Sequence, residues 1–416
     1  RGGDQPVGSF SGEGGSFGTG RGAGQAMGRK GRFDYSLGAS WMRIGEQVDR
    51  DEFSLGTLSF RGGVALGATR QLTLTARFHD KQYRGFAEAS GGPEFALVRD
   101  LKDSRAREIV LGVGYQSQVK PWWNYTMDFD WFSRSEDVFT PAIADRFPPG
   151  PQFRPPLDTD SRFHRLRANH FHFFNFSTRW TATLGVQVRG ETGQNETLIA
   201  SAFPGSFGFG RTIGGATGEL TYTGDRLALT MGRRGAKADG LADRSSPRLG
   251  ASYKLWAGGP RVKSSWGRGF KLPSFYALGE PNIGNAGLRP ELSEGFDLGV
   301  EHRFGRTGPI VGITWFRNRF EDLVDFSPSA FRLVNRSEAV TRGLELESRL
   351  PFAGQFELGG HVTYLDWDLK QTDEALRDRP RWRGGVNFSW QMSRKARLTW
   401  DTVWVGRRFD FQVPVP

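Results

Sequence analysis

The sequence contains no cysteine among its 416 residues. This absence excludes a disulfide scaffold, a thiolate metal site, an iron–sulfur cluster and a cysteine nucleophile. Long apolar runs are also missing. No stretch of about 18 apolar residues occurs, which excludes a bundle of transmembrane helices. Intrinsic disorder is excluded as well, because 34 phenylalanines and 13 tryptophans supply far more apolar surface than disordered chains carry.

The charge balance is strongly basic, with a formal net charge of +11 and a pI near 10.0. Proteins that bind nucleic acid usually gather their lysines and arginines on one helix or patch. Here arginines are scattered along the chain and carboxylates are interleaved with them. We therefore expect no nucleic-acid partner, and we expect the basic groups to face water or the phosphates of a lipid surface.

Alternation of apolar and polar residues dominates the sequence, and helical periodicity is almost absent. In residues 72–79, Leu, Leu, Ala and Phe alternate with Thr, Thr, Arg and His. About nineteen such segments follow one another, each about ten residues or longer, whereas strands of soluble sheets have about five or six. Their centres lie near residues 10, 24, 38, 60, 76, 112, 127, 170, 186, 216, 231, 251, 265, 298, 314, 343, 362, 386 and 402.

The connections between these segments alternate in length. Short polar turns follow the even-numbered segments, and long loops follow most of the odd-numbered ones. The clearest predicted loops are 80–105, 133–162, 192–211, 272–293 and 366–380. The second of these carries six prolines, which a strand inside a sheet could not accommodate: Pro141, Pro148, Pro149, Pro151, Pro155 and Pro156.

Short turns on one rim, long loops on the other and alternating strands between them are typical of an outer-membrane β-barrel. In lipid only a closed sheet leaves no unpaired edge, so alternation gives an apolar exterior and a polar lumen. A soluble propeller would show shorter strands and a self-similar repeat of about 40–50 residues, which the sequence lacks. The predicted fold is therefore all-β, a transmembrane antiparallel β-barrel.

Four motifs indicate which family of barrels the sequence resembles. Residues 264–278 read SSWGRGFKLPSFYAL, residues 285–293 read NAGLRPELS, residues 314–324 read TWFRNRFEDLV, and 334–347 run from VNR to RGLELE. In order and spacing they resemble the motifs of TonB-dependent outer-membrane receptors. The positions that carry the resemblance are Gly267, Gly269, Phe270, Pro273, Asn285, Leu288, Pro290, Glu291, Asn318, Asp322, Asn335, Gly343 and Glu345. We interpret them as architectural rather than as ligand contacts. One departure is Ala286, which stands where the family usually has proline.

The resemblance implies a barrel of 22 strands preceded by an N-terminal plug. The segments counted here supply about 19 of the expected 22 strands, so residues 1–416 are expected to be an incomplete barrel without plug or last strands. The implied function is TonB-energised uptake of a scarce metal chelate, either a ferric siderophore or cobalamin. The implied partners are the outer-membrane lipid and lipopolysaccharide, the TonB complex acting through the plug, and the chelate, with the receptor a monomer of the Gram-negative outer membrane.

Ligand contacts are expected from the long loops and the upper lumen. Aromatic faces next to cations would suit an anionic, ring-bearing chelate. The candidates are Tyr83, Arg84, Phe139, Arg154, Phe207, Arg211 and Tyr276.

Other readings of single motifs stay open. A metal could bind His164, His170 and His172, or calcium could bind Asp49-Arg50-Asp51-Glu52, but spacing fixes no complete ligand set for either. We expect no cofactor and no resident metal. A passive porin is the first functional alternative and an outer-membrane barrel hydrolase the second, although we do not expect an enzyme.

Overall fold

A computed structural model describes residues 6–87, 90–144, 153–241, 243–327, 329–370 and 379–407. It contains nineteen strands and two short helices. The strands are β1 (Val7–Gly14), β2 (Gly20–Lys30), β3 (Phe33–Gly45), β4 (Glu52–Ala65), β5 (Arg70–Gly85), β6 (Lys102–Lys120), β7 (Trp123–Thr140), β8 (Leu157–Asn175), β9 (Trp180–Ile199), β10 (Phe203–Thr223), β11 (Leu227–Ala238), β12 (Arg244–Lys254), β13 (Arg261–Lys271), β14 (Glu291–Arg303), β15 (Ile310–Ser327), β16 (Arg332–Phe352), β17 (Phe356–Leu369), β18 (Trp382–Gln391) and β19 (Arg397–Val405). The helices are α1 (Gly92–Phe95) and α2 (Phe275–Gly279).

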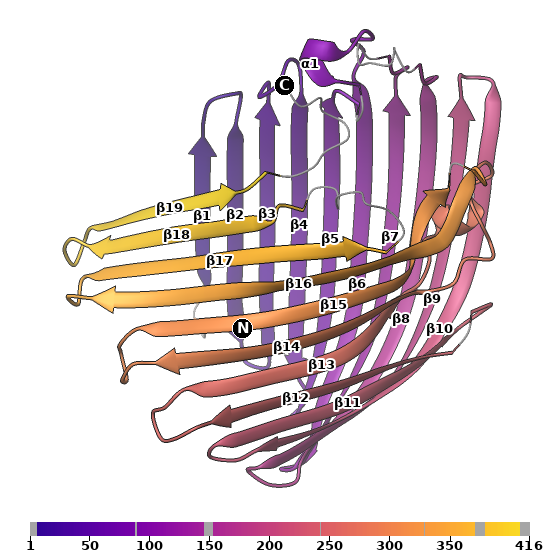
Figure 1. The fold of residues 1–416 in the computed structure, drawn as a ribbon. Coiled ribbons are helices and arrows are strands. Elements are labelled where there is room, and N and C mark those ends of the chain that lie inside the picture. Colours follow the sequence, from indigo (N-terminus) through magenta and orange to yellow (C-terminus); the bar gives the residue numbers. More distant parts are fainter. Residues whose placement is uncertain are drawn as a thin grey trace.

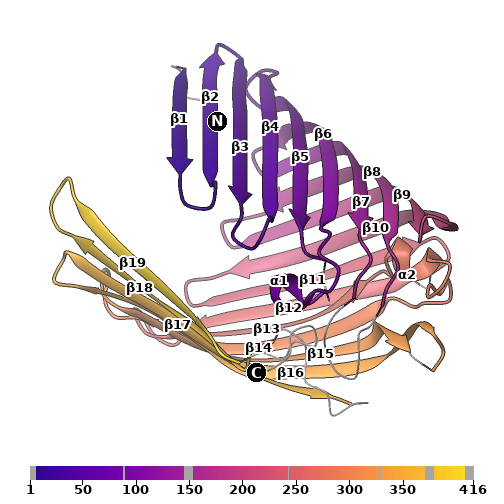
Figure 2. The same ribbon diagram turned by 90° about the horizontal axis from the view of Figure 1, so that it is seen from above.

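Every strand pairs with its neighbours in the chain, and every pair is antiparallel. The resulting single sheet curls on itself, so that β1–β10 form one wall and β11–β19 cross it as a second wall (Figure 1). Seen from above, the two walls enclose a lumen, and β1 and β19 lie on either side of the opening (Figure 2). The predicted all-β barrel architecture and its nineteen strands are confirmed.

The alternation places apolar side chains on the outside of the walls. Leu184, Val186 and Val188 of β9 are all more than half exposed, while Gln187 and Arg189, which alternate with them, face the lumen. Buried apolar side chains among the described residues are few and mostly small: Ala87, Ala96, Ala106, Ile143, Ile213, Ala238, Ala277, Leu288 and Ala339. A soluble protein would not expose so many large apolar groups. This outer face is the surface that contacts lipid.

Aromatic side chains border the apolar surface at two levels. Near the short turns, Trp180 packs on Tyr222 with ring centroids 4.9 Å apart, and Phe356 stacks on Trp390 at 5.6 Å. Towards the long loops, Tyr364 packs on Trp382 at 4.7 Å. Phe356 and Tyr364 share one face of β17, and their eight-residue separation corresponds to about 26 Å. Because the strands of outer-membrane barrels are tilted by roughly 35–45°, this length spans about 20 Å of the bilayer, which is comparable with their apolar band of about 25 Å.

Several predicted loops are shorter than the sequence suggested. The predicted loop 192–211 is wrong, because β9 and β10 continue through it as paired strands and leave only residues 200–202 as a turn. Its glycines and polar residues resembled a loop, but β9 pairs there with β8 and β10, and residues 203–211 of β10 pair with β9. The loops 80–105 and 133–162 likewise shrink to 86–101 and 141–156.

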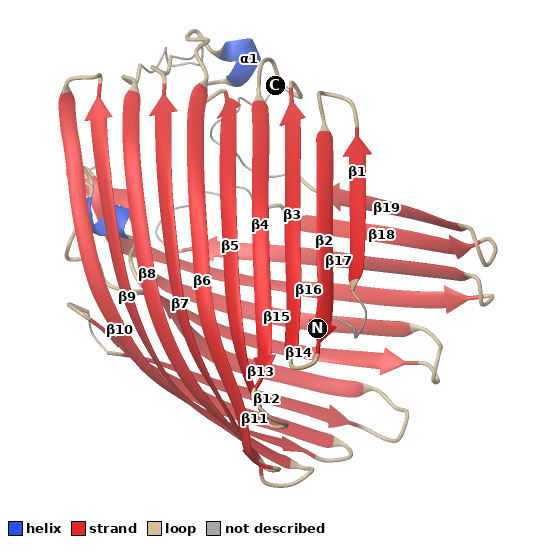
Figure 3. Cartoon of the chain, turned by 180° about the vertical axis from the view of Figure 1, so that it is seen from behind, coloured by secondary structure: helices blue, strands red, loops and turns tan. Residues whose placement is uncertain are grey.

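The remaining long connections agree better with the prediction. The connection between β13 and β14 is residues 272–290 and carries α2. Of the predicted loops, residues 145–152 with Pro148, Pro149 and Pro151, and residues 371–378, lie outside the described residues. Within the described part of the chain, no helix has the length and apolar character needed to cross a bilayer. Figure 3 shows both helices at the long-loop end of the strands.

Candidate functional site at the inner mouth

The candidate ligand contacts do not share one face of the barrel. Successive residues of a strand point to opposite faces. Tyr83 therefore faces the lumen on β5 with Gly85, whereas Arg84 lies on the outer face with Phe78. Phe139, 46% exposed, continues the outer face of β7.

Arg84 and Phe139 line one outer hollow beside Glu52 and Asp103, with a volume of about 570 Å³. The Arg84 guanidinium donates to Glu52 at 3.3 Å. Arg154 lies in an isolated bridge with Ile143 outside the named strands. The structure therefore does not bring Arg84, Phe139 and Arg154 to the lumen site described next.

Towards the long loops, an aromatic layer, called here the lid, lies on the inner wall where α2 packs against β8–β10. The Phe275 ring packs against Phe163 and Phe209, with centroids 6.0 Å and 6.1 Å away. Tyr276 meets Phe207 edge to face at 6.3 Å. A Cβ at Gly193 would come within 2.5 Å of the Phe275 ring, so glycine is required there for the lid to lie flat on the wall.

Arg211 fastens this lid to the wall. Its Nε donates to Glu191 Oε2 at 2.8 Å, and its Nη1 donates to the carbonyl oxygen of Pro273 at 2.8 Å. The guanidinium also lies 4.7 Å from the centroid of the Phe275 ring. Because the Arg211 side chain is only 15% exposed, these contacts are largely shielded from water. Arg211 holds the loop, and it presents little surface of its own to the lumen.

Tyr276 is the exposed member of the lid, with 52% of its surface accessible. Burial of its phenol among neighbouring groups raises the pKa of Tyr276, and the nearby carboxylate of Glu280 raises the pKa further. The phenol is therefore protonated throughout the physiological range and can donate a hydrogen bond to a bound ligand.

The other end of the same loop is clamped by the family-motif residues. Asn335 accepts from the amide of Arg289 at 2.7 Å and donates to the carbonyl of Arg289 at 3.0 Å and that of Asp322 at 2.7 Å. Arg289 donates to the Asp322 carboxylate at 2.6 Å. Asn285 donates to the Leu333 carbonyl at 2.9 Å. The loop is thus tied to β15 and β16 by side chains that lie far apart in sequence.

The clamp depends on a bulge in β15. The register of β15 against β16 shifts between Phe320 and Leu323, and Asp322 has a φ of 56°. Glu291 accepts from the amide of Val324 at 3.0 Å and from Lys271 at 2.9 Å, which joins β13, β14 and β15. Leu288 is 2% exposed, and Pro290 is as fully buried.

The remaining motif residues lie in the barrel wall. A Cβ at Gly343 would overlap the carbonyl oxygen of Tyr364 and press on the Phe316 ring, so only glycine fits. A Cβ added at Gly269 would lie 2.8 Å from the Ser293 hydroxyl oxygen, and a Cβ added at Gly295 would lie 2.8 Å from the Asn318 side-chain oxygen. A Cβ added at Gly267 would make only ordinary contacts. Phe270 pairs with Leu292, and Glu345 pairs with Thr314 and Thr363. These placements support an architectural role.

His164, His170 and His172 all lie on the outer face of β8. His170 and His172 lie on the outer face near the short turns, with ring centroids 4.4 Å apart, and Trp123 donates to His172 at 3.1 Å. His164 stacks on Trp131 further up the same strand. No group of three or more potential metal ligands occurs in the part of the chain that the structure describes.

Carboxylates of the acidic segment 49–52 form ion pairs with arginines. Asp49 pairs with Arg99 at 2.7 Å and Glu52 with Arg43 at 3.0 Å.

Residues 14–18, which read GGSFG, match the G-x-S-x-G pattern of a hydrolase nucleophile elbow. They follow β1 directly and lead into β2, a strand–turn–strand context rather than the strand–turn–helix that an elbow requires.

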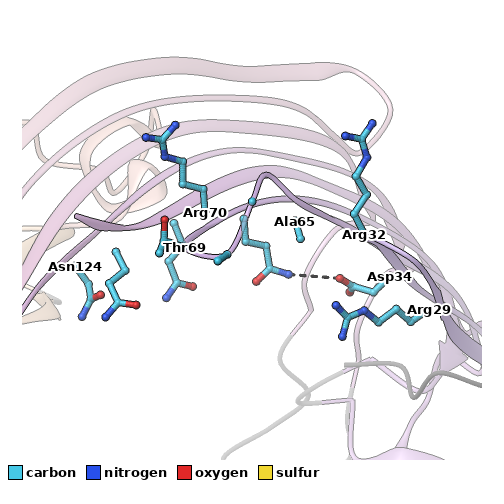
Figure 4. Close-up of a pocket in the computed structure, with 12 residues that line it drawn as sticks. Arg29, Arg32, Asp34, Ala65, Thr69, Arg70 and Asn124 are labelled. Atoms are coloured by element: carbon cyan, nitrogen blue, oxygen red, sulfur yellow. Dashed lines mark hydrogen bonds between the residues drawn. The ribbon is translucent and has the colours of Figure 1, made fainter. Parts of the chain in front are cut away.

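A polar hollow of about 400 Å³ lies on the inner wall at the opposite, short-turn end. Figure 4 shows Arg29, Arg32 and Arg70 around it, with Asp34 accepting a hydrogen bond from Gln71 at 3.4 Å. Asp34 also accepts from Arg61 at 3.0 Å. Its lining comes from six strands, β2 to β7, and no sequence motif marks it.

Comparison with known proteins agrees with this geometry. Residues 40–414 match the family model described as "TonB dependent receptor-like, beta-barrel". The siderophore receptor PirA of Acinetobacter baumannii superposes with a TM-score of 0.78 at 15% identity, over 98% of this chain and 69% of that one.

Two curated relatives match over shorter segments. The vitamin B12 transporter BtuB of Vibrio vulnificus (strain YJ016) is 32% identical over 156 residues, 35% of this chain. The ferrienterobactin receptor of Escherichia coli (strain K12) is 26% identical over 220 residues, 46% of this chain. These segments span only 24% and 29% of the two relatives.

Proposed function

Because this chain belongs to the TonB-dependent receptor β-barrel family, we propose that it forms the wall of a receptor for a scarce metal chelate. The receptor captures the chelate at the cell surface, and a TonB-energised step passes it inward across the Gram-negative outer membrane. The observation that supports the proposal is the loop between β13 and β14, whose aromatic side chains Arg211 and the Asn335 clamp hold against the inner wall of the barrel.

The cargo is a ferric siderophore first and cobalamin second. The relatives bear the names of a ferrienterobactin receptor, a vitamin B12 transporter and a siderophore receptor. Phe207, Phe209 and Tyr276 provide ring faces for a chelate that itself carries rings. Binding and transport, rather than catalysis, follow from this arrangement.

Further strands complete the ring, and a plug fills the lumen and connects to the TonB complex. The support for completion is that β1 and β19 each pair with one neighbour in the described residues. An unpaired strand edge in lipid leaves several backbone groups unsatisfied, at several kcal/mol each. The receptor works as a monomer and binds no nucleic acid.

Lipopolysaccharide surrounds the outer face above the aromatic border. Arg268 and Trp266 both donate to Glu294 there, at 2.8 Å and 3.2 Å. Arg319 and Lys370 share Glu338 at 2.8 Å and 3.1 Å. A belt of this kind suits the phosphates and bridging cations of the outer leaflet.

Uptake by living cells tests the proposal against a passive porin. Cells that make the protein would be given radiolabelled ferric siderophore or cobalamin with and without a protonophore. We expect accumulation that stops when the proton-motive force collapses and in cells that lack TonB. Accumulation that is unaffected by both treatments would favour a porin.

A further inference from the structure

Three exposed cations lie close together on the short-turn rim of the barrel. Lys30 and Arg32 belong to the turn that joins β2 and β3, and Arg70 begins β5 after the next short turn. The amide of Ala65, at the end of β4, donates to the carbonyl of Arg32 at 2.8 Å, so the two turns lie next to each other. The side chains of Lys30, Arg32 and Arg70 are called here the basic patch.

Two contacts place the first part of the patch on the outer face. Lys30 pairs across the sheet with Phe33, whose side chain is 50% exposed on the outer face of β3. Residues that pair across a sheet point to the same side of it. The guanidinium of Arg32 lies 5.2 Å from the centre of the Phe33 ring. Both cations therefore border the apolar outer surface.

Arg70 faces the same way. It lies two residues before Leu72, which is exposed on the outer face of β5, so the two side chains share that face. In Figure 4 the side chains of Arg32 and Arg70 extend to one side of the wall, opposite to Asp34. The basic patch is thus separate from the lumen.

No carboxylate neutralises the basic patch. Residues 28–33 and 64–72, which form the two turns and the adjoining strand ends, contain neither aspartate nor glutamate. Asp34 lies on the lumen face, where it accepts from Arg61 at 3.0 Å and from Gln71 at 3.4 Å. Within the part of the chain that the structure describes, none of the three cations forms an ion pair.

An apolar row adjoins the patch on the same outer face. Phe33, Val64, Leu72 and Tyr115 are successive cross-strand partners on β3, β4, β5 and β6. Short turns of outer-membrane barrels lie on the periplasmic side, where the lipid leaflet consists of phospholipids. Cations at the turns and apolar side chains next to them match a lipid with an anionic head and acyl chains.

We propose that the basic patch binds the phosphate of an anionic phospholipid of the periplasmic leaflet, with the acyl chains of that lipid against the apolar row. Guanidinium groups form bidentate hydrogen bonds with phosphate oxygens. One lipid bound in this way joins the turn between β2 and β3 to the turn between β4 and β5. The site does not depend on which cargo the receptor carries.

Native mass spectrometry counts the lipids that the protein binds. The full receptor, purified in a non-ionic detergent, would be titrated with phosphatidylglycerol, which is anionic, and with phosphatidylethanolamine, which is zwitterionic. We expect phosphatidylglycerol to bind at the lower concentration. Inorganic phosphate should not displace it, because the apolar row also holds the acyl chains.

A double variant tests the basic patch itself. Arg32→Gln/Arg70→Gln changes only exposed side chains, so the barrel should fold and keep its heat-modifiable band. It should bind one phosphatidylglycerol fewer than the wild-type protein at the same lipid concentration. The matched control, Arg29→Gln/Arg77→Gln, removes two charges from the lumen face of the same part of the wall and should bind as the wild type does.

Three results would overturn the proposal. They are equal binding of the two lipids by the wild-type protein, an unchanged number of bound lipids in the double variant, and displacement of the lipid by inorganic phosphate. The last would identify a free anion as the ligand. None of these results bears on uptake of a chelate, so the proposed receptor function is tested separately.

Discussion

Replacing Arg211 with methionine tests how the lid is held. The substitution keeps an apolar stem but removes the hydrogen bond to the Pro273 carbonyl and the contact with the Phe275 ring, which hold the lid, together with the hydrogen bond to Glu191, which lies within the wall. The first is worth about 1.5 kcal/mol because its donor is charged. The second is worth about 1 kcal/mol. The loss of about 2.5 kcal/mol would raise the population of the detached lid roughly 70-fold.

Hydrogen exchange measures this opening directly. The amides of Leu278 and Glu280 are bonded within α2, to the carbonyls of Ser274 and Tyr276. In Arg211→Met they should exchange roughly 70-fold faster, while amides of β16 and β17 keep their wild-type rates. Arg77→Met serves as the control for loss of an inner-face charge. Unchanged exchange in α2 would refute the claim that Arg211 fastens the lid.

Three further predictions concern the clamp, the wall and the lid. Asn335→Ala removes three hydrogen bonds to Arg289 and Asp322. Because these bonds are partly open to water, the loop should lose about 1–2 kcal/mol of its attachment to the wall. We expect faster proteolysis within residues 283–290 at an unchanged melting temperature of the barrel. Equal proteolysis would contradict the clamp. Gly343→Ala should abolish the heat-modifiable folded band on a denaturing gel, since its Cβ overlaps the Tyr364 carbonyl, whereas Gly312→Ala on the neighbouring strand has room and should fold. Burial, and next to it the carboxylate of Glu280, raises the pKa of Tyr276. The neutral phenol therefore contributes its full stability below the ordinary tyrosine pKa of about 10. This contribution declines only as pH rises through the pKa of the folded state. An ultraviolet difference titration against Tyr276→Phe would contradict this if the phenol ionised at or below that value.

The alternation of residues was enough to predict the number of strands and the parity of their connections. It was enough because each strand has one face in lipid and one in water, so apolar and polar residues alternate along every strand. It failed at residues 192–211, where both faces of the sheet are wet above the membrane. Residues 192–197 are all glycine or polar, and only the pairing of β9 with β8 and β10 identifies a strand there.

The candidate site was only partly predictable. Phe207, Arg211 and Tyr276 were selected for their residue types and do meet at the lid. Arg84 and Phe139 were selected by the same rule, but both occupy strand positions whose side chains point to the outer face of the barrel. The pairing of Glu191 with Arg211 was missed because it forms only through the register of β9 against β10, which local sequence does not specify.

The most direct test of the central claim is whether this barrel binds a chelate or conducts ions. The receptor with its plug, purified in detergent, would be titrated with ferric siderophores and cobalamin, and the same preparation would be inserted into planar lipid bilayers. The account predicts saturable binding at submicromolar concentration and no steady conductance. A protein that binds no probe and conducts ions freely would contradict it and establish a porin.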